Sequence, residues 1–237
     1  MEENASDSKL YRIGGIAGLA SGLLGIVANA LHPRPVPANL GNNEKFLELV
    51  SGYELWRIDH LMIIFAVLLG LVAFVALARS MSFTSAAAWA RVALAASIAS
   101  GAVAMVSFSI DGSVLSAAAD EWAAASGEAQ LAVLERFAAI AYIDMAIFSV
   151  AILGLFGATP ILFGAALWHS GLYERWIGAT ALAGGVLGLI SGSWIWMVGG
   201  FNIGNFLVLF TAASVLFTIW IFGASLRLLR LAKQDSL

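Results

Sequence analysis

Residues 61–78 read LMIIFAVLLGLVAFVALA, a run of 18 residues without a charged side chain. An α-helix rises about 1.5 Å per residue and the hydrocarbon core of a bilayer is about 30 Å thick, so roughly 20 apolar residues cross it. In lipid, only helices and closed barrels satisfy all backbone hydrogen bonds, and this run lacks the alternation of a barrel strand. The run therefore predicts a transmembrane helix.

Five other stretches share its length and its shortage of charge. Of the 237 residues, 61% are hydrophobic and 11% are charged, whereas soluble domains have about 45–50% and about 25%. We therefore expect an all-α fold, a polytopic integral membrane helical bundle of about six transmembrane helices, as a single membrane domain over residues 1–237. The predicted spans are residues 13–31, 58–79, 88–110, 144–168, 176–198 and 203–226.

The two longest connections, residues 32–57 and 111–136, are predicted to cap one end of the bundle. The first contains a short amphipathic stretch around residues 46–50, and the second has Ala-rich helical stretches on either side of Ser126-Gly127. The second cap is expected to continue into the fourth span, where Pro160 should kink the helix.

Lysine and arginine are distributed unevenly between the two ends of the predicted bundle. Eight lie on the side of the N-terminus and four on the side of the caps. Because cytoplasmic loops carry the excess of Lys and Arg, both termini are expected in the cytoplasm and both caps outside. The acidic residues gather on the cap side.

Composition also excludes several classes of function. A net charge of −3 offers no basic surface to a nucleic acid. The chain has no cysteine, so any metal must be held by His and carboxylate. No phosphate-binding loop, nucleophile elbow or dinucleotide fingerprint occurs. The expected partners are membrane lipids and either further copies of the chain or a larger membrane complex.

A few ionisable residues fall at the cap ends of the predicted spans. Placing an ionisable side chain in lipid costs free energy, so residues of this kind are candidates for a function. His32, His60, Asp111 and Asp144 come from four different helices and could meet in one polar pocket. Neutral imidazole and ionised carboxylate suit a transition metal such as zinc, iron or manganese, which can activate water for hydrolysis. These four residues are therefore the candidate metal ligands.

Two other interpretations remain open for the same residues. In the first, the histidines are interfacial, with His60 or Arg57 hydrogen-bonded to Asp111 or Asp144. In the second, Asp144 titrates or pairs with an arginine in a proton or ligand site. Asp59 and Glu135 are expected to be solvated helix-end charges, and His169 is expected to lie about one bilayer thickness away, at the other end.

Glycines recur every four residues in the first and fifth spans. Small residues at this spacing line one helix face and allow close helix contact, so they predict packing interfaces or a dimer seam. The residues are Gly14, Gly18, Gly22, Gly184, Gly188 and Gly192.

Four short strings suggest a resemblance. They are Leu31-His32-Pro33, Trp56-x-x-x-His60, Asp111-Gly112 and Asp120-x-Trp122. In these strings the chain resembles small bacterial multi-pass membrane proteins catalogued as a domain of unknown function. The resemblance implies a six-span layout and does not indicate which activity the chain has. The expected location is the bacterial cytoplasmic (inner) membrane. Membrane hydrolases of the alkaline ceramidase type match poorly, because this chain has no pair of histidines four residues apart on a late helix.

Three functions follow as hypotheses. The first is a binding, accessory or assembly protein with a polar pocket at the outer leaflet. The second is a metal-dependent membrane enzyme that uses His and carboxylate ligands on a lipid-like substrate. The third is a small transporter in which Asp144 takes part.

Overall fold

The computed structural model describes residues 2–33, 42–198 and 203–234, and all the regular secondary structure in these ranges is helical. Six of the helical segments are long and apolar enough to cross a membrane. The predicted all-α, multi-pass membrane bundle is therefore confirmed. In chain order the elements are α1 (Glu2–Leu31), α2 (Asn43–Ser51), α3 (Trp56–Ser80), α4 (Ala87–Ser109), η1 (Ile110–Leu115), α5 (Ser116–Ala124), α6 (Glu128–Ala151), η2 (Ile152–Ala158), α7 (Thr159–Ser170), α8 (Arg175–Val198) and α9 (Ile203–Gln234).

The third and fourth spans belong to much longer helices than hydropathy alone indicates. The helices through α4–η1–α5 and α6–η2–α7 contain 38 and 43 residues, or about 57 and 65 Å at about 1.5 Å per residue. Since the hydrocarbon core is about 30 Å thick, both project well beyond it. They meet in a hairpin at Gly127, whose φ of 61° suits glycine. Residues 111–136 are thus mostly helix, with a break at the predicted position.

The distortion expected at Pro160 takes the form of a π-helical segment. Proline has no amide hydrogen, and its ring clashes with the carbonyl four residues before it. Here η2 ends two residues before the proline, and Pro160 lies in the first turn of α7. The π segment is the change in helical form next to Pro160, and the predicted kink itself stays a prediction.

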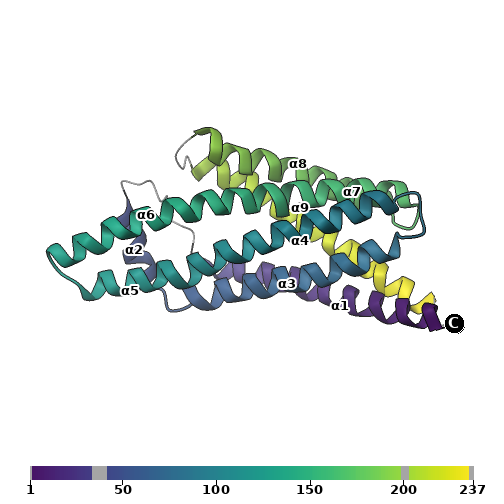
Figure 1. Cartoon of the computed structure of the whole chain (residues 1–237), viewed down its shortest axis with the longest axis horizontal. Helices are drawn as coiled ribbons and strands as arrows, with labels where there is room; N and C mark the ends of the chain where they lie inside the picture. The colour runs from purple at the N-terminus through teal and green to yellow at the C-terminus, as the bar shows by residue number, and fades with distance from the viewer. Residues whose placement is uncertain (1, 34–41, 199–202, 235–237) are drawn as a thin grey trace.

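Both ends of the described chain lie at the same end of the bundle, as an even number of spans requires (Figure 1). The Ser8 hydroxyl donates to the carbonyl oxygen of Ala232 at 2.7 Å, which joins the start of α1 to the end of α9. Arg79 at the end of α3 forms two bonds to Asp7, of 2.8 and 2.9 Å. We call this the terminal end. Its location in the cytoplasm stays a prediction.

The opposite end, which we call the cap end, carries α2, α5 and the first part of α6 (Figure 1). The predicted amphipathic stretch forms α2, which buries Phe46, Leu47 and Val50. These side chains join Trp56 and Phe137 in a second hydrophobic cluster, separate from the main core. The cap is therefore packed onto the bundle.

All six of the periodic glycines face other helices of the same chain. A Cβ atom at Gly18 would overlap Ser225 on α9, and one at Gly188 would overlap the backbone of Phe156 in η2. Gly14 faces Ala76, Gly22 faces Phe222, Gly184 faces Leu216 and Gly192 faces Leu153. These contacts are intramolecular, so glycine at these positions allows close packing within one bundle.

Candidate functional site

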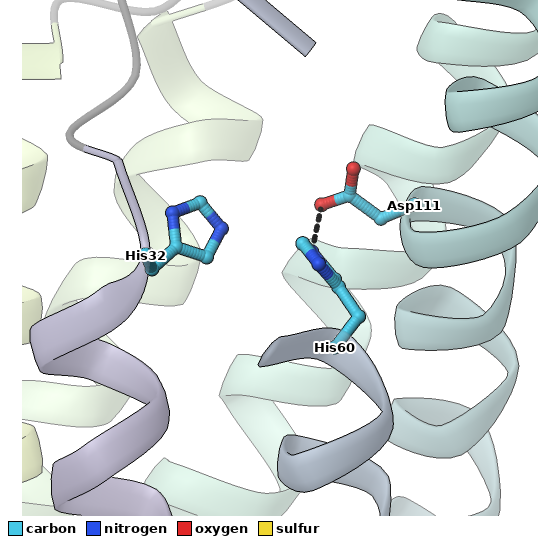
Figure 2. Close-up of side chains that lie close together, drawn as sticks. All are labelled: His32, His60 and Asp111. Carbon is cyan, nitrogen blue, oxygen red and sulfur yellow. Dashed lines mark ion pairs between the residues drawn. The ribbon is translucent and has the colours of Figure 1, made fainter. Parts of the chain in front are cut away.

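Three of the four candidate ligands meet at the cap end of the bundle. His32 directly follows α1, His60 lies in the second turn of α3, and Asp111 lies in η1. Each offers one ligand atom, and these atoms all lie within 4.8 Å of one another. Figure 2 shows the two imidazoles and the carboxylate around a common gap. The Nε2 atom of His60 lies 3.1 Å from Oδ2 of Asp111.

The backbone around His32 directs one ring nitrogen into this gap. Its amide donates to the carbonyl oxygen of Ala28 at 2.8 Å, which prolongs α1 by one bond. Tyr53 donates its hydroxyl to the carbonyl of Leu31 and ties the start of α3 to the end of α1. The Nδ1 atom of His32 lies 2.8 Å from the carbonyl oxygen of Pro33. A carbonyl only accepts, so Nδ1 carries a proton and Nε2 is free to bind a cation.

His60 is held between hydrogen-bond acceptors on both sides. Its Nδ1 atom lies 2.7 Å from the carbonyl oxygen of Trp56 and 2.6 Å from Oδ1 of Asp59. Its Nε2 atom faces Asp111. Nδ1 must therefore carry a proton, and something positive must also lie between Nε2 and the Asp111 carboxylate. That positive charge is either a second proton, shared between Nε2 and the carboxylate, or a metal ion.

Asp59 is completely buried, with an exposed fraction of 0%. The expectation of a solvated helix-end charge at Asp59 is therefore wrong, whereas Glu135 is exposed as expected. Burial arises because the cap cluster around Trp56 and the close approach of η1 cover the first turns of α3. Neither oxygen of Asp59 accepts a hydrogen bond from the described part of the chain, so its ion-pair contact is the one to His60. An isolated buried carboxylate is costly, so Asp59 depends on this contact with His60.

Trp56 forms one wall of the site. Its ring is nearly fully buried, and its centroid lies 5.0 Å from that of His32 and 4.8 Å from that of His60. Its indole Nε1–H donates to the carbonyl oxygen of Asp111 at 3.0 Å. The indole thus fixes η1 against α3 and excludes water from one side of the imidazoles.

The string Asp111-Gly112 has a clear structural reason. A Cβ atom at Gly112 would lie 2.5 Å from Cβ of His60 and 3.0 Å from its Cγ. Glycine is therefore needed for η1 to approach α3 closely enough for Asp111 to reach His60. The π-helical form of η1 is also a feature that often marks functional sites in helices.

Asp144 is buried nearby but does not belong to the group of three. Its Oδ1 atom accepts a hydrogen bond from the Ser107 hydroxyl at 2.9 Å. Ser107 lies one turn before Asp111, so Asp144 lies deeper in the bundle than the three ligand atoms. Arg57, the other suggested partner, forms an exposed ion pair with Asp120 at 2.5 Å.

His169 lies at the terminal end, as expected. Ser85, in the turn between α3 and α4, donates to its carbonyl oxygen at 3.1 Å. The side chain of His169 is exposed. It therefore provides a histidine in the same chain that has no part in the site.

Sequence reasoning missed the contributions of Asp59 and Trp56. Trp56, Asp59 and His60 have the spacing i, i+3, i+4, which places their side chains on one face of α3. That spacing is the signal that could have identified Asp59 as a partner of His60.

Comparison of the chain with protein-family models, with curated proteins and with solved structures found no match.

Proposed function

We propose that this multi-pass membrane protein binds a transition-metal ion through His32, His60 and Asp111 at the cap end of its bundle. The observation that carries the proposal is the environment of His60. Its Nδ1 side is occupied by Trp56 and Asp59, while Nε2 faces a carboxylate and a second imidazole. A divalent ion in the gap would neutralise Asp111 and use the free Nε2 atoms of both histidines.

The donor set agrees with known metal chemistry. Two imidazoles and one carboxylate hold zinc in hydrolases and Fe²⁺ in non-haem oxygenases. Ligating histidines commonly donate their other ring nitrogen to a carboxylate or a carbonyl, as His60 does to Trp56 and His32 does to Pro33.

Three protein ligands leave a coordination position for water or substrate, which is typical of catalytic rather than structural sites. A bound ion would supply a Lewis acid or a hydroxide near neutral pH. We therefore favour a metal-dependent membrane enzyme over a structural metal site. The excess of Lys and Arg at the terminal end, with the family resemblance, supports an orientation in which the site faces outward from a bacterial inner membrane.

A second candidate is an accessory or assembly protein in which His60 is a buried imidazolium. The 3.1 Å contact with Asp111 and the 2.6 Å contact with Asp59 favour it, since an imidazolium has a protonated nitrogen facing each carboxylate. The helical hairpin that projects at the cap end would then offer a surface to a partner.

Elemental analysis of detergent-purified protein separates the two candidates. The metal proposal expects near-equimolar zinc or iron, lost in His60→Ala and Asp111→Ala but retained in His169→Ala, the matched control. Folded wild-type protein that neither carries a transition metal nor binds added Zn²⁺ or Fe²⁺ would reject the metal and favour the buried ion pair.

A further inference from the structure

A cavity of about 540 Å³ lies within the bundle, among α1, α3, α4, η2 and α9. Its lining is mostly apolar and includes the rings of Phe74, Phe156, Phe217 and Phe222. Three of its few polar side chains already bond to carbonyl oxygens of the helices: Ser21 to Ala66, Asn29 to Gly25 and Thr218 to Ser214. The cavity is therefore suited to a hydrocarbon rather than to a polar solute, and its volume is typical of small-molecule sites, which are about 300–1,000 Å³.

This cavity begins directly below the candidate metal site. Asn29 on α1 precedes His32 by three residues, Ile63 on α3 follows His60 by three, and Phe108 on α4 precedes Asp111 by three. The helices that lead to the three ligands, α1, α3 and α4, thus also line the cavity, about one helical turn of 5.4 Å further into the membrane. The apolar cavity therefore lies next to the polar site, on its membrane side.

The separation of α1 from α9 forms the cavity. Towards the terminal end the two helices touch, because Gly15, Gly18 and Gly22 face Leu229, Ser225 and Phe222. One turn further along α1, a Cβ atom at Gly25 would meet nothing within 4 Å. The helices therefore diverge beyond Gly22 and leave space between them.

The cavity is accessible from the side that faces lipid. Ile26 of α1 and Val215 and Ile219 of α9 line it, and their exposed fractions are 46%, 53% and 42%. In a membrane, the molecules that contact these exposed side chains are the acyl chains of the bilayer itself. Ser214 also lines the cavity, and its hydroxyl is buried without a hydrogen-bond partner in the described part of the chain.

We infer that the cavity holds an acyl chain of a bilayer phospholipid, with the lipid's polar ester and phosphate region at His32, His60 and Asp111. The inference rests on the proposed function for the chemistry of the head group, since carbonyl and phosphoryl oxygens are ligands that a bound metal ion would take. The acyl chain enters laterally between α1 and α9. The position of the cavity next to the site therefore points to a membrane glycerophospholipid as the substrate of the proposed enzyme.

Photo-crosslinking in liposomes tests this inference directly. The probe is a phosphatidylcholine with a diazirine near the end of one acyl chain, and crosslinked peptides are identified by mass spectrometry. We expect stronger labelling of the cavity-lining residues of α1 and α9, such as Gly25 and Val215, than of lipid-facing residues such as Ile190 on α8. Uniform labelling of all lipid-facing surfaces would overturn the inference, and this readout needs no variant.

A matched pair of variants on α1 sharpens the test. Gly25→Phe should place a ring in the cavity, since a Cβ atom at Gly25 meets nothing within 4 Å, whereas Ile16→Phe changes only an exposed position on the same helix. We expect a several-fold fall in cavity labelling for Gly25→Phe and none for Ile16→Phe. Unchanged labelling in a folded Gly25→Phe protein would contradict the inference.

Metal content, measured on the same samples, distinguishes a failure of the acyl-chain inference from a failure of the proposed function. Metal-loaded protein with an unlabelled cavity overturns the lipid site alone. Metal-free protein with a labelled cavity supports the acyl-chain site and rejects the metal.

Discussion

His60 and Asp111 approach each other across two helical elements, with Nε2 of the histidine 3.1 Å from Oδ2 of the aspartate. Since Nδ1 of the same ring already donates on its other side, this short contact requires a positive charge between the two residues. Whether that charge is a proton or a metal ion is the central question about this protein.

Replacing Asp59 with asparagine tests whether the buried carboxylate supports a metal through His60. The amide keeps the shape but removes the charge that orients the imidazole and raises its basicity. We expect affinity for Zn²⁺ to fall by roughly 10- to 100-fold, as for other partners of metal-bound histidines. Competition with a chromophoric chelator measures this loss.

The matched control for Asp59→Asn is Asp120→Asn, which removes an exposed ion pair with Arg57. Exposed pairs contribute little, so neither zinc affinity nor stability should change noticeably. If Asp59→Asn lowered thermal stability while zinc affinity stayed at its wild-type value, the carboxylate would serve an ion pair and not a metal site.

Replacing Gly112 with alanine should separate η1 from α3. The new Cβ would lie 2.5 Å from Cβ of His60, so one element must shift. Overpacking of this kind costs about 1–3 kcal/mol, and the shift should also weaken metal binding because it moves Asp111. Thermal unfolding in detergent and zinc titration measure the two effects.

Gly25→Ala is the control for this change, because its Cβ enters open space. Alanine is favoured over glycine in a helix by roughly 1 kcal/mol, so the control should be neutral or slightly stabilising. Equal behaviour of the two variants would mean that the approach of η1 to α3 does not depend on glycine.

The six spans were predictable because each is a local property of about 20 consecutive residues. The break at Gly127 and the amphipathic α2 were also predictable, since glycine and apolar spacing act locally. The burial of Asp59 was not, because it depends on η1 and the cap, which are distant in sequence. The meeting of His32, His60 and Asp111 in one pocket was a hypothesis that rested on their shared end of the bundle, since hydropathy does not fix how helices rotate about their axes.

Glycines on α1 and α8 should matter for folding of the single chain. A side chain at Gly188 would overlap the backbone of Phe156, which cannot rotate away as a flexible side chain could. We therefore expect Gly188→Val to lower the unfolding temperature and the yield of folded protein. Gly25→Val is the matched control and should fold normally. A folded Gly188→Val protein that changed only its oligomeric state in size-exclusion chromatography would instead place Gly188 at a dimer seam.

The orientation of the bundle can be tested directly because the natural chain has no cysteine. Single cysteines replacing the exposed Ser126, in the connection between α5 and α6, and Ser85, in the turn between α3 and α4, place one thiol at each end. We expect a membrane-impermeant maleimide to label Ser126→Cys in intact cells and Ser85→Cys only after the membrane is opened. This result would locate His60 at the outer face. The reverse pattern would place the candidate site in the cytoplasm, and labelling of both in intact cells would contradict a bundle that crosses the membrane between them.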